Sequence, residues 1–264
     1  MQRKFCRRIG FTLIELVVVL VIIAAIAGFV LPRVSMIGRS SDMAASAKSQ
    51  ADLGNNIELY FVLQKRYPQG FDSLLDTTGA LFSSDTTDAN TQTRGLPYAG
   101  ADGTRLQAQL VAGELTTVTN AEYLRSFSRA GFDYVYDHDT TAINSNNSTA
   151  ASAQRLTTAT PFKVAEVTGT ALIAKLCPQG LATDERLVAV GVGGRVAAIG
   201  KTMSNSPIYP GCDGKYYGRY VAVFKVFASG ERAVLVGVID SYGRTPDYTT
   251  QQFNESLPNG GRQG

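Results

Sequence analysis

Histidine and cysteine are scarce in this chain, which has one histidine and three cysteines among 264 residues. The single histidine, His138, excludes zinc sites that are built from several histidine ligands. The cysteines Cys6, Cys177 and Cys212 form no C-x-x-C pair, so a zinc ribbon or a thioredoxin-like site has no support. The chain also lacks a G-x-S-x-G segment, the nucleophile elbow of serine hydrolases. The residue patterns that these metal sites and hydrolases require are therefore missing.

Clusters of basic residues are absent after residue 10. The chain has 25 Lys and Arg residues and 22 Asp and Glu residues, and four of the basic residues lie in the first ten positions. The rest of the chain is near neutral, with 21 basic residues against 22 acidic ones. A nucleic-acid-binding domain normally carries a basic patch or stripe, so we expect no nucleic-acid partner.

A long apolar run follows the basic start of the chain. Residues 11–31 contain only two polar side chains, Thr12 and Glu15, and a helix of these 21 residues would be ~30 Å long, the thickness of a bilayer core. By the positive-inside rule, the basic residues hold the N-terminus in the cytoplasm, and the chain after residue 32 crosses to the other side of the membrane. A carboxylate at the middle of such a helix costs about 2.5–3.5 kcal/mol on insertion scales, which marks Glu15 as a candidate functional residue.

Three interpretations of this N-terminus compete. A cleavable secretory signal would be cut after Ala27 in Ala25-Ile26-Ala27, but the apolar run is long for such a signal and contains Glu15. A plain signal anchor explains the length and the charges, and it leaves Glu15 unexplained. The third interpretation uses the segment RRIGFTLIEL, which the other two ignore.

The segment RRIG followed by FTLIELVVVLVIIAAIAGFVLP closely resembles the class III leader of type IV pilins and type II secretion pseudopilins. The resemblance implies that residues 1–10 are a leader peptide, that a prepilin peptidase cuts between Gly10 and Phe11, and that the same enzyme methylates the new amino group. The family's glutamate and its helix-bending proline then fall on Glu15 and Pro32. The resemblance covers roughly the first 35 residues.

The position of Glu15 agrees with this resemblance on physical grounds. A cut after Gly10 would start the helix at Phe11, and Glu15 would then lie about one turn from a free amine and from the positive end of the helix macrodipole. Glu15 can compensate its own helix start, or it can face the Phe11 amine of a neighbouring subunit. The resemblance implies the second arrangement, in which Glu15 sets the register of an incoming subunit, and the cost of an unpaired carboxylate in lipid favours it.

We expect one long helix over residues 11–64 that is transmembrane over residues 11–31 and kinked at Pro32; the alternative is that Pro32 only marks the end of the span. The second half of the helix carries an apolar stripe at helical spacing, formed by Leu53, Ile57, Tyr60 and Phe61. Such a stripe packs on a folded head. The small residues at 44–47 either let neighbouring helices approach closely or reflect plain helix propensity.

The long helix must end before Pro68, because the residue before a proline is pushed out of the α region. Tyr67-Pro68 followed by QGFDSLL resembles the loop after the helix in the major pseudopilin and related pilins. We therefore expect residues 65–264 to form an extracytoplasmic pilin-like head. A loop-rich insertion is predicted at about 83–160, where subunit-specific surface function would lie.

The head is predicted to be α+β. A short helix and turn are expected in FDSLLDTTGAL, a second short helix at 121–130 and a strand at 132–136. Further strands are predicted at 162–167, 171–176, 186–192, 195–199, 219–228 and 232–239. Several strands after one long helix indicate an antiparallel sheet packed on that helix. The tail after Tyr242 is expected to be loose.

Export of the head would place Cys177 and Cys212 in an oxidising compartment, where such a pair usually forms a disulfide; two buried free thiols are the alternative. His138 is flanked by Asp133, Asp137 and Asp139, which have oxygen ligands for calcium. Some pseudopilins hold calcium in a loop of the head, but the family's calcium-loop pattern does not occur here. We interpret this stretch as a solvated acidic turn and expect no cofactor.

The sequence therefore predicts a structural filament subunit of the type IV pilus or type II secretion pseudopilus kind, and not an enzyme. The resemblance implies partners: the subunit itself and other pilin-like subunits, the prepilin peptidase, a membrane platform protein, a cytoplasmic assembly ATPase and membrane lipid. It also implies a bacterial inner-membrane precursor with its head outside the cytoplasm, and later a periplasmic or extracellular filament. The alternatives are a membrane-anchored extracytoplasmic binding module or enzyme with the same N-terminal anchor, and a secreted protein that is cleaved after Ala27.

Overall fold

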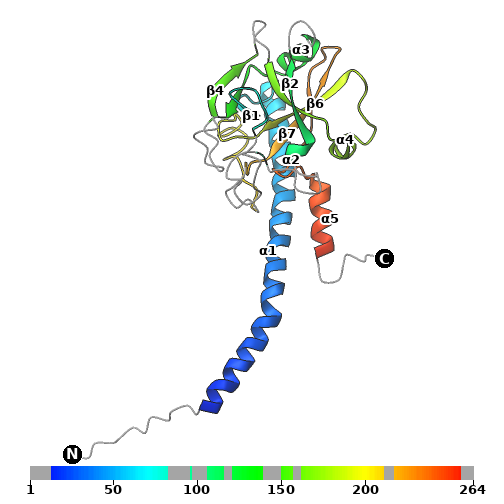
Figure 1. The fold of residues 1–264 in the computed structure, drawn as a ribbon. Coiled ribbons are helices and arrows are strands. Elements are labelled where there is room, and N and C mark those ends of the chain that lie inside the picture. Colours follow the sequence, from blue (N-terminus) through cyan, green and yellow to red (C-terminus); the bar gives the residue numbers. More distant parts are fainter. Residues whose placement is uncertain are drawn as a thin grey trace, which may run out of the picture.

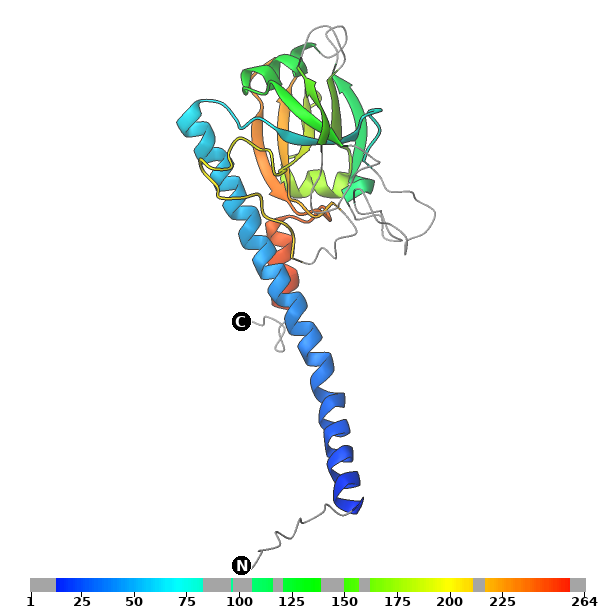
Figure 2. The same cartoon turned by 90° about the vertical axis from the view of Figure 1, so that its left-hand side faces the viewer.

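The computed structural model describes residues 13–82, 96, 106–115, 121–138, 150–156, 162–210 and 217–256. A single long helix, α1 (Leu13–Gln64), carries a folded head on its C-terminal half, and its N-terminal half extends away from the head (Figures 1 and 2). At 1.5 Å rise per residue, the 52 residues of α1 span about 78 Å. The fold is therefore α+β, as the sequence predicts.

The helix α1 ends where the Tyr67-Pro68 pair predicts. Lys65, the residue after the helix, adopts a left-handed backbone with φ 59°, and its N–H donates to the carbonyl oxygen of Phe61 at 2.7 Å. This geometry is the usual way to close the last turn of a helix. The chain then enters the head through Tyr67, which is fully buried.

The head contains an eight-stranded sheet. Its strands are β1 (Phe71–Asp76), β2 (Leu110–Leu115), β3 (Tyr134–His138), β4 (Ala150–Arg155), β5 (Phe162–Val167), β6 (Glu185–Gly191), β7 (Val221–Phe227) and β8 (Val234–Ile239). The main path runs β2-β5-β6-β1-β3-β4, and β7 joins β6 to β8. Because β6 pairs with three strands, the sheet divides beside it and curls.

The expectation of a purely antiparallel sheet is wrong, because β1 and β3 pair in parallel, with Phe71 opposite Val135. Parallel neighbours need a long crossover connection. Here the connection holds α2 (Leu106–Gln109), β2 and α3 (Ala121–Arg129). The region 83–160 is thus built into the sheet where it is described, since it supplies β2, β3 and β4.

Several predicted elements are confirmed. The helix expected at 121–130 is α3, and the strands expected at 162–167, 186–192, 219–228 and 232–239 are β5 to β8 within two residues at each end. The strand expected at 132–136 is β3, which begins two residues later. In these segments the apolar residues either recur with a clear helical or strand period, or they form long runs next to glycine-containing turns.

Other predicted elements are wrong. The segment expected as a strand at 171–176 is the helix α4 (Thr170–Leu176), and the one expected at 195–199 is a series of turns that bury Val196 and Ala198. The stretch after Gly70, expected as a helix and turn, is the strand β1. The tail holds the helix α5 (Pro246–Ser256), which lies beside α1 below the head (Figures 1 and 2). Apolar runs of four to eight residues fit a strand or a buried helix equally well, so tertiary packing decides between them.

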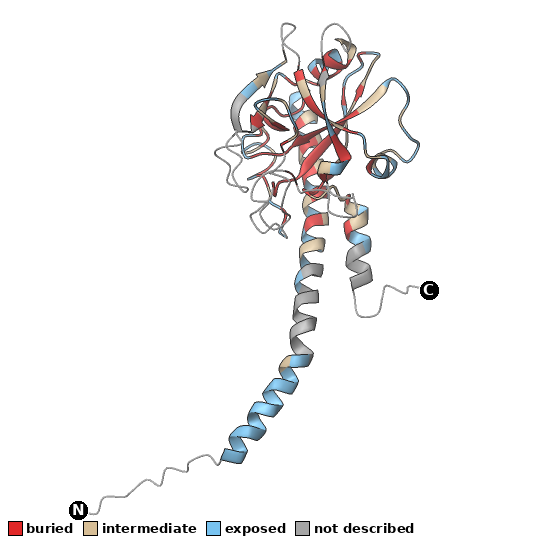
Figure 3. Cartoon of the chain, in the orientation of Figure 1, coloured by how far each residue is buried: buried red, intermediate tan, exposed pale blue. Residues whose placement is uncertain are grey.

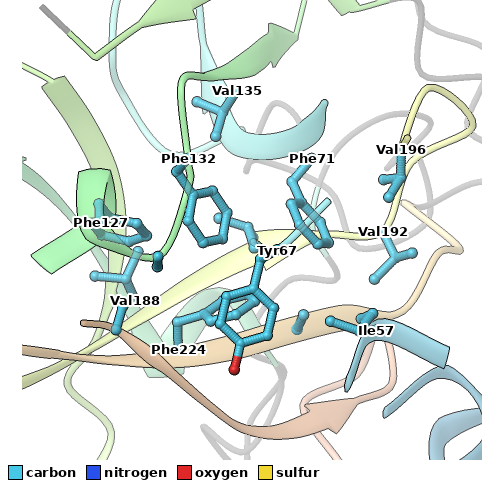
Figure 4. Packing of buried hydrophobic residues seen from close by; sticks show 14 of the residues in the cluster. Ile57, Tyr67, Phe71, Phe127, Phe132, Val135, Val188, Val192, Val196 and Phe224 are labelled. Carbon is cyan, nitrogen blue, oxygen red and sulfur yellow. The ribbon is translucent and has the colours of Figure 1, made fainter. Parts of the chain in front are cut away.

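Aromatic side chains fill the core between α1 and the sheet (Figure 4). The ring of Phe224 on β7 lies 5.0 Å from Tyr67 and 5.0 Å from Phe132, and Phe71 lies 5.7 Å from Phe132. These tilted and edge-on contacts are favourable for aromatic pairs. A second apolar cluster, which includes Leu74, Leu106 and Leu172, lies apart from this first one. The buried residues concentrate in the head, whereas residues 13–26 of α1 are exposed (Figure 3).

Candidate functional site

The N-terminal end of α1, over residues 13–26, is an exposed and largely apolar surface (Figure 3). The exposed fractions of its large apolar residues range from 82 % at Leu13 to 46 % at Val17. The exposed apolar residues are Leu13, Ile14, Leu16, Val17, Val18, Val19, Leu20, Val21, Ile22, Ile23 and Ile26. Eight of them, at positions 16–23, are consecutive, so the helix is apolar on every side. A helix of this kind is normally buried among apolar partners.

Glu15 is the acidic residue in the first turn of α1. Its side chain is exposed, and the positive end of the helix macrodipole favours a carboxylate at this position. Gly10 and Phe11, the predicted processing site, lie outside the described residues. The pairing of Glu15 with the Phe11 amine therefore stays a prediction.

The helix continues through Pro32 for a further 32 residues. Pro32 therefore lies inside the helix and does not end it. Figure 1 shows that α1 bends along its N-terminal half. A proline inside a helix removes one backbone hydrogen bond and favours such a bend. The kink at Pro32 itself stays a prediction.

The C-terminal half of α1 packs on the head through one stripe. Five residues at helical spacing are buried there: Ser46, Gln50, Leu53, Ile57 and Tyr60. Three of them were predicted, and the fourth predicted residue, Phe61, is partly buried against the same cluster. Sequence analysis missed Ser46 and Gln50 because polar side chains do not register as part of an apolar period. Ala44 and Ala45 are exposed, so of the small residues at 44–47 these two face away from the head.

A buried polar joint connects α1 to the C-terminal segment. Gln50 Nε2 donates to the backbone oxygen of Arg244 at 3.2 Å. Arg244 Nε in turn lies 2.7 Å from Oδ2 of Asp240, which is fully buried. The other oxygen of Asp240 accepts the N–H groups of Tyr242 and Arg244, both at 2.9 Å. Burial raises the pKa of Asp240, and the Arg244 guanidinium acts in the opposite direction. This joint holds α5 beside α1.

The acidic residues around His138 have different surroundings. Asp137 is buried and accepts a hydrogen bond from Gln154 Nε2 at 3.1 Å, and burial raises the pKa of its carboxyl group. Asp133 is exposed, 3.9 Å from Arg66 Nη1. His138 ends β3, and Asp139 lies outside the described residues. In the part of the chain that the structure describes, no three His, Cys, Asp or Glu side chains are grouped so that they could hold a metal ion.

Cys177 directly follows α4 and is partly buried, and burial raises the pKa of its thiol; among the residues that the structure describes it forms no disulfide. Cys212 lies outside the described residues. The predicted disulfide between the two is therefore not described and stays a prediction.

Across the described ranges, no helix has both the length and the apolar content that a membrane crossing requires.

Comparison with known proteins gives one match. Residues 6–31 match the family model of the prokaryotic N-terminal methylation motif, which is the class III prepilin leader of type IV pilins and pseudopilins. The matched segment contains Gly10, Phe11 and Glu15. Neither the curated proteins nor the solved structures include a match to this chain.

Proposed function

We propose, from the N-terminal methylation motif at residues 6–31, that this protein is a structural subunit of a type IV pilus-like or type II secretion pseudopilus filament. A prepilin peptidase removes residues 1–10 and methylates Phe11. The subunit then enters the filament through α1. Its role is assembly, not catalysis.

One observation carries the proposal: the matched motif runs into a helix that is apolar on every side over residues 16–23 and is packed on the head through its C-terminal half. The helix and the head are held together by the buried stripe on α1. If the N-terminal half of α1 is displaced, the helix and the head would therefore move together as one body. This arrangement suits a subunit whose helix is held in the membrane before assembly and packs against other helices in the filament.

The proposal includes a location and a set of partners. The basic residues before Gly10 would hold the leader in the cytoplasm, and the precursor would span the inner membrane once, with its head outside the cytoplasm. Lipid would cover the apolar half of α1 in the precursor, and helices of the same or related subunits would cover it in the filament. The motor of assembly would be a cytoplasmic ATPase that acts through a membrane platform protein.

Mass spectrometry of the N-terminus of the mature chain tests the proposal. We expect N-methyl-Phe11 as the first residue. A chain that begins at Met1 would indicate an uncut anchor for a binding module or enzyme, and one that begins at Gly28 would indicate a secretory signal. Either result would overturn the proposal.

A matched pair of glycine variants controls this experiment. Gly10→Val places a branched side chain at the predicted cleavage site and should leave the precursor uncut. Gly28→Ala lies within α1, where an added Cβ meets no atom within 4 Å, and should be processed like the wild-type chain. Equal processing of both variants would place the cut elsewhere.

A further inference from the structure

The helix α5 covers one side of α1 directly below the head (Figures 1 and 2). Among the elements that the structure describes, α5 makes the most extensive contact with α1. The contact begins at Gln50, whose Nε2 donates to the backbone oxygen of Arg244, and α5 then runs towards the N-terminal end of α1. At 1.5 Å rise per residue, the 11 residues of α5 span about 16 Å, so α5 lies beside α1 over about residues 40–50.

The burial of the α1 residues in this range defines the side that is covered. Ser46 is buried, and Asp42, Met43 and Ala47 are half-buried. These four residues lie three, four, seven or eight positions before Gln50, so they share one side of the helix with it. We call these four residues the covered side.

The turn that leads into α5 is anchored to the head. The guanidinium of Arg244 is bonded to the buried carboxylate of Asp240, and it lies 4.9 Å from the ring centre of Tyr209 and 5.1 Å from that of Tyr242. Gly243 has a left-handed backbone with φ 81°, which lets the chain reverse there. The turn therefore stays with the head, and any movement of α5 would begin after it.

Below this turn, α5 is held by a small contact. Of the α5 side chains that the structure describes, only Thr249 is buried. Its hydroxyl donates to the backbone oxygen of Pro246 in its own helix at 2.8 Å, which leaves its methyl group for the contact. The stripe that joins α1 to the head, in comparison, buries the large side chains Leu53, Ile57 and Tyr60. Because hydrophobic stabilisation follows the apolar area that is buried, α5 is held less firmly than the head.

The remaining features of α5 also favour release. A helix of 11 residues is marginally stable by itself in water. A tie to α4 is made by Lys175, whose exposed side chain places Nζ 4.3 Å from the ring centre of Tyr248, and such a contact is weak at an exposed site. Segments with few buried apolar contacts open at a lower free energy than the core of a domain.

We propose that α5 is a releasable strap that closes the covered side of α1 in the free subunit and swings away about the turn at 240–244 when a neighbouring subunit docks there. While α5 is seated, it occupies the space that a partner would need on this side. This inference rests on the proposed function and adds an autoinhibitory contact to it. The strap opens without unfolding of the head, because its pivot is anchored separately.

Amide hydrogen exchange of the full-length chain in detergent tests the release. In the wild type, α5 should exchange about tenfold faster or more than β7, which lies in the core. Thr249→Asp places a carboxylate in the contact, on a side of α1 that already carries Asp42. It should speed exchange in α5 by a further factor of about ten and leave β7 unchanged.

Thr250→Asp is the matched control. Thr250 is exposed on the same helix, and its hydroxyl donates to the same Pro246 oxygen at 2.9 Å. The control adds the same charge to α5 outside the contact, so it should exchange like the wild type.

The rate of filament formation tests the autoinhibitory role. Thr249→Asp should assemble faster than the wild type by about threefold or more, because the covered side is already open. Thr249→Val exchanges a hydroxyl that bonds its own helix for a methyl group, which enlarges the apolar contact. It should slow assembly by about threefold.

Three results would overturn the inference and leave the proposed function intact, provided that N-methyl-Phe11 is found. They are equal exchange in α5 and β7 of the wild type, assembly of Thr249→Asp at the wild-type rate, and loss of assembly in Thr249→Asp while Thr250→Asp assembles. The last result would show that the filament needs α5 in its seated position. A wild-type chain that keeps Met1 and forms no filament would instead overturn the proposed function, and the role of the strap in assembly with it.

Discussion

The hydroxyl group of Tyr67 lies 2.9 Å from Oε1 of Glu58 on α1 and accepts the N–H of Leu235 on β8 at 3.2 Å. Tyr67 follows the end of the helix by three residues and is 1 % exposed. One side chain therefore ties the last turns of α1 to the strand that packs beside them. The orientation of the helix on the head depends on contacts of this kind.

Removing the Tyr67 hydroxyl should weaken this tie and change the pH dependence of stability. Tyr67→Phe should lose about 1 kcal/mol at pH 8, because the hydroxyl makes two hydrogen bonds and the Leu235 N–H loses its acceptor. Burial raises the pKa of Tyr67 from 10.0 to about 12. Above pH 10 the unfolded chain releases this proton before the folded chain does, so wild-type stability falls as pH rises from 10 to 12.

Thermal unfolding of both chains in detergent, at about pH 8 and about pH 11, checks this prediction. The variant should lose less stability between the two pH values than the wild type. Tyr217 and Tyr220 also have a raised pKa, so a decline remains in the variant. Identical declines in the two chains would contradict the assignment to Tyr67.

Breaking the buried pair of Asp240 and Arg244 should destabilise the head strongly. Arg244→Met leaves the Asp240 carboxylate buried without its cation, for an expected loss of about 3–5 kcal/mol. Adding Asp240→Asn removes the buried charge and should recover part of this loss. Chemical denaturation followed by circular dichroism measures both, and Arg125→Met, in an exposed pair, should change stability by less than about 1 kcal/mol.

Replacing the glycine in the packed half of α1 should stabilise the protein. A Cβ at Gly54 would meet Val238 Cγ2 at 3.9 Å, an ordinary contact, so Gly54→Ala should add about 0.5–1 kcal/mol by restricting the unfolded chain. Gly191→Ala is the opposite case, because its Cβ would lie 1.9 Å from the Tyr217 hydroxyl. The two variants should shift the melting temperature in opposite directions, and a lower melting temperature for Gly54→Ala would refute the first expectation.

Glu15 should matter for assembly and not for processing. Glu15→Ala should be cleaved normally, and it should enter filaments alongside wild-type subunits at least about tenfold less than the wild type, because the charge that guides docking is gone. Quantitative mass spectrometry of purified mixed filaments measures the ratio. Glu122→Ala on the exposed surface of α3 is the control, and incorporation of Glu15→Ala at the control level would remove the role.

The mature chain should contain no free thiol. Cys6 leaves with the leader, and Cys177 and Cys212 are predicted to pair outside the cytoplasm. Alkylation under denaturing, non-reducing conditions, followed by mass measurement, should therefore add no label. Two labelled thiols would refute the disulfide, and in that case Cys177 should react slowly in the folded chain, because burial raises its pKa.

Much of the first 64 residues and part of the head were predictable from sequence, because their signals are local. The leader segment around Gly10 and Phe11 matches the methylation motif as a contiguous string. The buried positions Leu53, Ile57 and Tyr60 follow from their spacing alone. The strands β5 to β8 are likewise runs of apolar or β-branched residues that end near glycines or turns.

Only the tertiary structure decided how these elements combine. The parallel pairing of β1 with β3 depends on a crossover of more than fifty residues, and the helix α4 differs from a strand only through its packing. Gln50 and Arg244 are 194 residues apart, so nothing local relates them. The sequence by itself determined the N-terminal methylation motif, where the long helix ends and which stripe of apolar residues packs on the head, because these depend on neighbouring residues. The order of the sheet, the position of α5 and the side of α1 that α5 covers depend on contacts between distant segments, and folding alone sets these.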